Sequence, residues 1–155
     1  VEKHNGEWLK EIGDGLLLSF DSSLDAVQCS IQIQEALRNE DDLDLRIGIH
    51  QGDIFIKDGD VYGDDVNVAS RIEPFSAVGG IAISDKVQRD ISSTPEYTTK
   101  YIGQPKLKGV QQEVKVYCIT SHGLPETKLS DVSAKLEKKT NWFKYAVSAA
   151  PADPK

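Results

Sequence analysis

The sequence is short of cysteine and of basic charge, and each shortage excludes a class of protein. Cys29 and Cys118 are the two cysteines among 155 residues, and they lie far apart in the sequence. Two cysteines so placed form neither a disulfide framework nor a metal-ligand motif, and they indicate a reducing compartment. The formal net charge of -7 argues against a nonspecific nucleic-acid partner, because such binding needs a basic face. A nucleotide ligand is not excluded, since a few local cations suffice to bind it.

Long apolar runs and two familiar catalytic patterns are also absent. No apolar run is long enough to span a bilayer, so we expect a cytoplasmic location, as a separate protein or as the cytoplasmic domain of a larger or membrane-attached one. The segment Gly13-Asp14-Gly15 is too short for a phosphate-binding loop of the Walker kind. His50 has no Ser or Cys nucleophile at a recognisable spacing, so a hydrolytic triad has no support.

The residues that are present suggest one globular domain followed by a different segment. Hydrophobic residues make up 39% of the chain and charged residues 28%, which is typical of a globular protein. Regular strand and helix patterns continue to about residue 119, and beyond residue 120 Lys, Ser, Thr, Ala and Pro prevail. We predict a domain over residues 1–120 and a linker or C-terminal tail over residues 121–155.

Short hairpins alternate with helices along the predicted domain. Asp-Gly between two apolar runs predicts a hairpin at residues 7–20. Apolar residues at helical spacing predict a helix over residues 23–38, and strict alternation predicts a strand over residues 43–51. Because the hairpins and helices do not form regular βαβ units, we predict the α+β class, with helices on one face of a largely antiparallel sheet.

The stretch from Asp60 to Glu73 has the pattern of a strand followed by a helix. Asp64 or Asp65 can cap the helix start. Asn67 and Arg71 are four residues apart and therefore share a helix face. An amide donor and a planar guanidinium on one face suit the negative charge that develops on a phosphate. An ordinary amphipathic helix with two polar surface residues has the same spacing, so both interpretations stay open on this stretch alone.

Four further polar residues allow a chemical role and an ordinary one. Asp14, at the tip of the first hairpin, could bind a hard divalent cation such as Mg²⁺, or serve only the turn. Lys10 and Arg46 stand on predicted strands, and Lys108 stands in a late loop. Each of these cations could equally be a solvated surface residue.

Taken together and in order, these motifs resemble the catalytic domain of class III nucleotidyl cyclases, the adenylate and guanylate cyclase family. The similarity covers roughly residues 1–119 and implies a ferredoxin-like sheet. Its four motifs are the hairpin Lys10 to Gly15, the strand pair Leu45 to Gly52, the helix region Asp60 to Arg71 and the loop Leu107 to Gly109.

The resemblance assigns four residues to substrate binding. Lys10 and Asp60 match the pair that selects adenine, because a Lys can donate to the purine and an Asp can accept from its exocyclic amine. Arg46 and Lys108 match cations that contact the triphosphate. The implied substrate is therefore ATP.

The resemblance assigns three residues to the reaction itself. Asp14 matches one of two aspartates that hold a pair of Mg²⁺ or Mn²⁺ ions. Asn67 matches the residue that orients the ribose, and Arg71 matches the one that stabilises the pentavalent phosphorus transition state. The implied reaction is attack of the ribose 3′-hydroxyl on the α-phosphate, which yields cyclic AMP and pyrophosphate.

The resemblance also implies a partner and a missing part. Because the family's site lies between two domains, a head-to-tail homodimer with two equivalent sites is implied, next to an adjoining membrane or regulatory domain. The family's first strand, which carries the other metal aspartate, and the helical segment after it are absent from this chain. A sheet without that central strand would have unpaired edges, and these residues alone are expected to catalyse little. The alternative is a non-catalytic cyclase-homology module that binds nucleotide or a partner domain.

Overall fold

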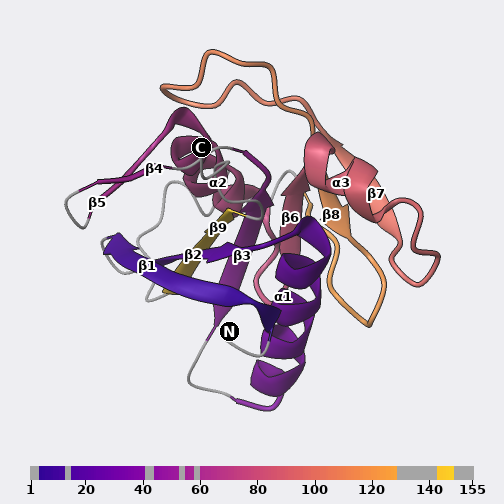
Figure 1. Ribbon diagram of the computed structural model, residues 1–155. Helices are drawn as coiled ribbons and strands as arrows, with labels where there is room; N and C mark the ends of the chain where they lie inside the picture. Colours follow the sequence, from indigo (N-terminus) through magenta and orange to yellow (C-terminus); the bar gives the residue numbers. More distant parts are fainter. Residues whose placement is uncertain are drawn as a thin grey trace.

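The computed structural model describes residues 4–12, 15–40, 44–52, 55–57, 60–128 and 143–148. Within these ranges a seven-stranded sheet has helices packed against it (Figure 1), and a two-stranded hairpin lies apart. The helices are α1 (Ser23–Leu37), α2 (Asp64–Ile72) and α3 (Asp85–Ile91), and the 3-10 turn η2 (Glu73–Phe75) follows α2. The strands are β1 (Gly6–Ile12), β2 (Gly15–Phe20), β3 (Leu45–His50), β4 (Phe55–Lys57), β5 (Asp60–Tyr62), β6 (Ile81–Ser84), β7 (Thr99–Gly103), β8 (Val116–Ile119) and β9 (Phe143–Ser148).

The strands of the large sheet follow the order β1-β2-β9-β3-β6-β8-β7. Antiparallel pairing joins β1 to β2, β6 to β8 and β7 to β8, and it also forms the separate β4–β5 hairpin. Parallel pairs are confined to the centre, where β9 pairs with β2 and β3, and β3 pairs with β6. With the hairpin included, four antiparallel pairs stand against three parallel ones among the described strands, and the predicted α+β class with a largely antiparallel arrangement is confirmed.

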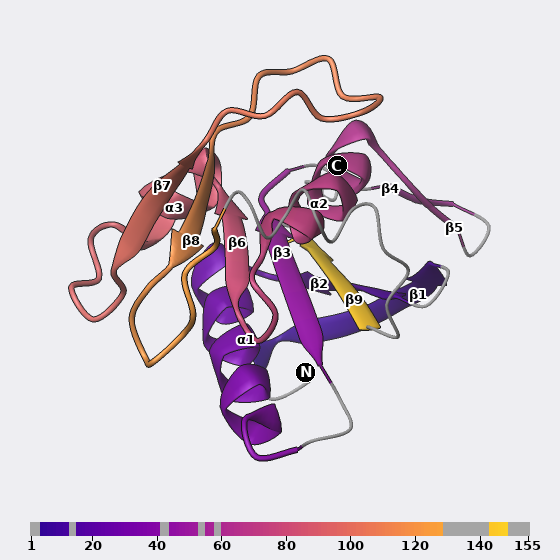
Figure 2. The ribbon, with the colours of Figure 1, turned by 180° about the vertical axis from the view of Figure 1, so that it is seen from behind.

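The centre of the sheet is occupied by a strand from the C-terminal part of the chain. β9 lies between β2 and β3 (Figures 1 and 2). In this register Ala146 stands opposite both Leu17 and Gly48. The resemblance implies a sheet that lacks its central strand, and the structure has a strand at that place. The boundary at residue 120 stays a prediction, although one strand from the segment 121–155 belongs to the sheet.

The helices cover both faces of the sheet, which differs from the predicted arrangement on a single face. Leu18, Ile81 and Ile83 belong to the core that α1 and α3 cover, whereas Leu17 and Ala82 face the side on which α2 packs. Figure 2 shows α2 in front of the sheet and α1 behind it. Since neighbouring residues of a strand point to opposite faces, apolar residues at consecutive positions allow both faces to be buried.

Gly48 in the middle of β3 lets the end of α2 approach the sheet. A Cβ atom at this position would lie 2.5 Å from the backbone nitrogen of Glu73 and 3.0 Å from the carbonyl oxygen of Ala69. Because those neighbours are backbone atoms, they could not move aside as a flexible side chain would. The absence of a side chain at Gly48 therefore sets the distance between α2 and β3.

Within the described ranges, none of the helices combines the length and the apolar character needed to cross a bilayer.

Candidate functional site

Helix α2 presents two of the predicted catalytic residues to solvent. Asn67 and Arg71 are exposed, while the other side of the helix is buried through Val68, Ala69 and Ile72. The helix is therefore fixed by its apolar side, and its polar side is left free for a ligand or a partner. The predicted spacing of Asn67 and Arg71 on one face is confirmed as geometry, and their chemical roles stay predictions.

The start of α2 is built differently from the prediction that Asp64 or Asp65 caps it. The N-cap residue is Gly63, with a φ of 133°, and no side chain caps the helix there. Gly63 suits this place because a φ in that range strains residues that have a Cβ.

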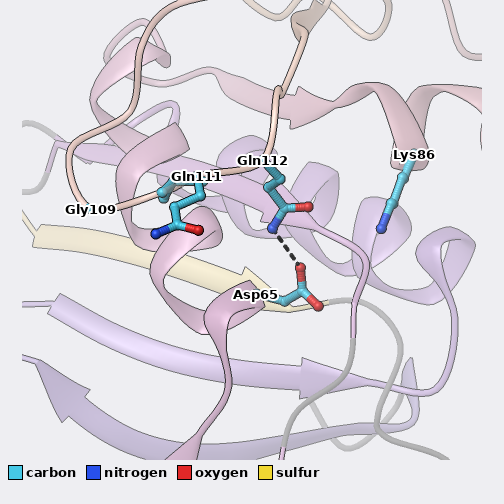
Figure 3. A pocket seen from close by; sticks show the side chains of 6 residues that line it. Asp65, Lys86, Gly109, Gln111 and Gln112 are labelled. Carbon is cyan, nitrogen blue, oxygen red and sulfur yellow. Dashed lines mark hydrogen bonds between the residues drawn. The ribbon is translucent and has the colours of Figure 1, made fainter.

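Asp65 binds neighbours from two other elements. Its Oδ1 lies 2.8 Å from His50 Nε2, at the end of β3, and it accepts a hydrogen bond of 3.2 Å from Gln112 Nε2. Figure 3 shows Gln112 reaching down to Asp65 from the loop above it. The Asp65 carboxylate therefore joins α2 to the sheet and to the loop between β7 and β8.

This loop carries Lys108 and is anchored on the same side of the sheet as α2. Leu107 is buried in a cluster that includes Val68 and Ile72 of α2, whereas its neighbour Lys108 is exposed. A buried residue beside an exposed cation fixes the loop backbone while the charge stays in water. The structure therefore brings the Lys108 loop and the helix of Asn67 and Arg71 into contact.

A cavity of about 500 Å³ opens between this loop and the starts of α2 and α3. Lys86 of α3 stands at one side of it (Figure 3). Its lining consists of Asp65, Lys86, Gly109, Val110, Gln111 and Gln112.

Arg46, predicted to contact the triphosphate, lies in the protein interior. It is 5% exposed, and its Nε lies 3.3 Å from Oε2 of Glu73, which is 1% exposed. Burial lowers the pKa of Arg46, and the negative charge of Glu73 opposes that shift. As described, Arg46 serves to tie β3 to η2, and a contact with phosphate would require it to exchange Glu73 for the ligand.

The predicted adenine-selecting residues stand on strands that contact each other. Lys10 is in β1 and Asp60 begins β5, and these two strands are in contact. The backbone arrangement is thus compatible with the pair acting together on one base.

The predicted metal ligand, Asp14, lies outside the described residues. Among those that the structure describes, His, Cys, Asp and Glu residues form no group of three that could hold a metal ion. The metal site therefore stays a prediction.

His50, Asp65 and Gln112 form a contact that the sequence did not reveal. His50 and Asp65 lie in two different motifs of the sequence, and Gln112 lies outside all four of them. Their separations of 15 and 47 residues follow no helix or strand period. Only the aligned ends of β3 and α2, with the loop folded over them, bring them together.

Stability is expected to fall on mild acidification because of His50. Burial of the ring lowers the pKa of His50 below its ordinary value of 6.5. The hydrogen bond to Asp65 and the negative charges of Asp65 and Asp85 oppose this shift, whereas the positive charge of Lys86 lowers the pKa further. The unfolded chain therefore binds a proton at a higher pH than the folded one. The stabilisation is complete at pH values above the pKa of His50 in the unfolded chain. It is lost as the pH falls through the lower pKa of His50 in the folded chain. Urea unfolding at pH values from about 8 to about 5 would measure it.

Two variants separate this effect from general acid sensitivity. His50→Gln keeps a side-chain N–H donor but has no group that titrates in this range, so its stability should fall less on acidification. His122→Gln, at an exposed histidine, should behave as the unaltered protein does. Equal pH dependence in His50→Gln and the unaltered protein would show that His50 is not the group responsible.

Comparison with known proteins agrees with this architecture. Residues 7–121 match the family model described as the adenylate and guanylate cyclase catalytic domain. A protein named putative adenylate cyclase 3, from Rhizobium meliloti (strain 1021), is 35% identical over 121 residues, which are 74% of this chain and 21% of the relative. The chain thus spans about a fifth of that relative's length.

Solved structures show the same fold. An adenylate/guanylate cyclase/hydrolase from Silicibacter pomeroyi matches with a TM-score of 0.68 and 33% identity, over 81% of this chain and 76% of that one. The guanylate cyclase domain of RhGC from Catenaria anguillulae, solved in complex with GTP, matches with a TM-score of 0.60 and 23% identity, over 77% and 75% of the two chains. The second match supports the fold alone. From the sequence match and the shared fold, this chain belongs to the adenylate and guanylate cyclase catalytic domain family.

Proposed function

We propose that this domain is part of an adenylate cyclase that converts ATP to 3′,5′-cyclic AMP and pyrophosphate. The observation that carries the proposal is the exposed pair Asn67 and Arg71 on one face of a helix whose other face is buried. A helix fixed in this way can hold an amide and a guanidinium in a constant orientation toward a phosphate.

In the proposed reaction, the ribose 3′-oxygen forms a bond to the α-phosphorus as the bond to pyrophosphate breaks. Negative charge builds on the oxygens of the pentavalent phosphorus. Arg71 would donate N–H groups to these oxygens, and Asn67 would hold the ribose in line for attack. Metal ions, bound in part by Asp14, would supply activation of the hydroxyl and neutralisation of the triphosphate.

The leaving pyrophosphate needs cations, and the two candidates differ in availability. Lys108 is exposed on a loop that is anchored to α2 through Leu107, so its ammonium group is free to reach a phosphate. Arg46 is held by Glu73. We therefore assign Lys108 the direct role and Arg46 a role that depends on release from Glu73.

ATP is favoured over GTP by Lys10 and Asp60. An Asp carboxylate accepts a hydrogen bond from the exocyclic amine of adenine, and guanine has a carbonyl oxygen at that place, which cannot donate. Contact between β1 and β5 supports the pair acting on one base. The name of the Rhizobium relative agrees with an adenylate cyclase, whereas the RhGC domain was solved with GTP.

The complete site is proposed to form between two copies of this domain in the cytoplasm. Asn67 and Arg71 are exposed on α2, so a second protomer would supply the opposite wall of the site. Two equivalent sites would form head to tail, and the association of the protomers would switch activity. An adjoining regulatory or membrane domain would control that association.

Cyclic AMP formation from ATP, measured with Mn²⁺ in the natural protein that carries residues 1–155, tests the function. We expect cyclic AMP from ATP and little cyclic GMP from GTP. The double change Lys10→Glu and Asp60→Ala should reduce the preference for ATP by about 10-fold or more, since each removes or reverses a hydrogen bond to the base.

Two results would argue against the proposal. Preferential formation of cyclic GMP would make the domain a guanylate cyclase. Nucleotide binding without either product, in a folded and dimeric protein, would favour the alternative of a non-catalytic module.

A further inference from the structure

A polar network joins three elements that carry or support the proposed site. His50 ends β3, Asp65 lies in the first turn of α2, and Gln112 belongs to the loop that also carries Lys108. Both His50 and Gln112 contact one oxygen, Oδ1 of Asp65. One carboxylate oxygen thus links the sheet, the proposed catalytic helix and the proposed phosphate-binding loop.

The chain around Asp65 is shaped to receive this carboxylate. A Cβ atom at Gly52 would lie 2.0 Å from Cγ of Asp65, so any other residue at position 52 would displace the carboxylate. The His50 side chain is 1% exposed and that of Asp65 is 18% exposed. A hydrogen bond to a charged group in such a sheltered place is stronger than one at the open surface.

The contact also decides where the proton of His50 resides. The Asp65 carboxylate can only accept, so Nε2 of His50 must carry the hydrogen. Neutral His50 then has an unprotonated Nδ1, which is buried and has no hydrogen-bond partner among the described residues. Among the described residues, the charged groups that act on the ring are Asp65 from α2 and Lys86 and Asp85 from α3.

Gln112 is the only member of the network that is exposed, and it connects the network to Lys108. The loop has apolar anchors in Leu107, Val110 and Val114, which belong to or pack against the cluster with Val68 and Ile72, and a polar anchor in Gln112. The apolar anchors hold the loop against the inner side of α2, and Gln112 adds the polar link to the first turn of that helix. Loss of one anchor would leave Lys108 on a freer segment, without removing its charge.

We propose that His50, Asp65 and Gln112 act as positioning residues, which hold the Lys108 loop against the start of α2 so that the cation and the Asn67–Arg71 face form one surface. None of the three is assigned a contact with substrate. The inference rests on the proposed function for its catalytic consequence, whereas the mechanical link between loop and helix stands independently of it.

Two neighbouring glutamines provide a matched pair of variants. Gln111 and Gln112 are both exposed in the same loop and both line the cavity, and the hydrogen bond to Asp65 belongs to Gln112. In Gln112→Ala, amide hydrogen exchange of residues 104–115 should quicken by about 3–10-fold, the effect of losing one hydrogen bond of ordinary net strength at an exposed position. Gln111→Ala should leave the exchange unchanged.

Substitutions at His50 test the other half of the network. His50→Leu removes the donor and should loosen both the start of α2 and the loop. His50→Gln keeps an N–H donor and should restore most of the protection. Equal exchange in all four variants would overturn the proposal, and so would equal loosening in Gln111→Ala and Gln112→Ala. If His50→Leu does not fold, Gln112→Ala alone still provides a valid test.

Kinetics of the natural protein that carries these residues separate this inference from the function itself. Gln112→Ala should raise the KM for ATP by about 3–10-fold with little change in kcat, and Gln111→Ala should change neither. A rise in exchange without any change in KM would limit the network to a structural role and overturn the positioning proposal. Absence of cyclic nucleotide from every variant, including the unaltered protein, would contradict the proposed function and leave the exchange result to decide the mechanical link.

Discussion

Replacement of Arg71 by alanine is expected to lower the kcat for cyclic AMP formation by about 10²–10³-fold, the usual cost of removing one preorganised donor from a developing oxyanion. The reason is that the Arg71 guanidinium is proposed to donate to the additional negative charge that builds on the α-phosphate oxygens in the transition state, beyond the charge that bound ATP already carries. An interaction confined to the transition state affects kcat and leaves KM nearly unchanged. Stopped assays of the natural protein with ATP and Mn²⁺, over a range of ATP concentrations, would give both constants.

The same experiment carries its own controls for charge and for folding. Arg71→Lys keeps the charge but loses the planar pair of donors. Its kcat should therefore lie between that of Arg71→Ala and that of the unaltered protein. Arg89, which is also exposed and stands in the last turn of a helix, provides a matched substitution to alanine that should keep full activity. Because Arg71 is exposed, Arg71→Ala should change the free energy of unfolding by less than about 0.5 kcal/mol. An unchanged kcat in Arg71→Ala would remove this residue from the reaction.

Placing proline at Ala146 is expected to destabilise the fold by about 3 kcal/mol or more, since it removes a ladder donor from a central strand, leaves a carbonyl acceptor unsatisfied and adds a steric clash. Ala146 stands opposite Leu17 in β2 and Gly48 in β3, within parallel pairs on both sides. A loss of this size is a large part of the 5–15 kcal/mol that stabilises a typical domain. Urea unfolding followed by circular dichroism would measure it.

The control for this substitution is a proline outside regular structure. Lys128 is exposed and belongs to no strand or helix. Lys128→Pro should therefore change the free energy of unfolding by less than about 0.5 kcal/mol. Equal stability of the two proline variants would show that β9 does not occupy the centre of the sheet in solution. The boundary predicted at residue 120 would then describe the domain well.

The sequence by itself determined the local elements and the family. Helical spacing in residues 64–72 specified which side of α2 is buried and placed Asn67 and Arg71 together on the other side. Ser22 caps α1 by accepting from the Asp25 backbone N–H, at the start of the helix that apolar spacing over residues 23–38 predicts. These features depend on neighbours within a few residues, so periodicity and capping preferences are enough to reveal them.

Tertiary structure alone decided which partners these elements meet. β9 enters the sheet from more than 90 residues beyond β3, Glu73 approaches Arg46 across the gap that Gly48 leaves, and Asp65 meets His50 and Gln112 instead of capping its helix. Each of these contacts depends on the packing of α2 against one face of the sheet. Strand order and helix packing follow from the total burial of apolar surface, which no local pattern records. They place Arg46 in a buried ion pair with Glu73 and bring Gln112 into contact with Asp65.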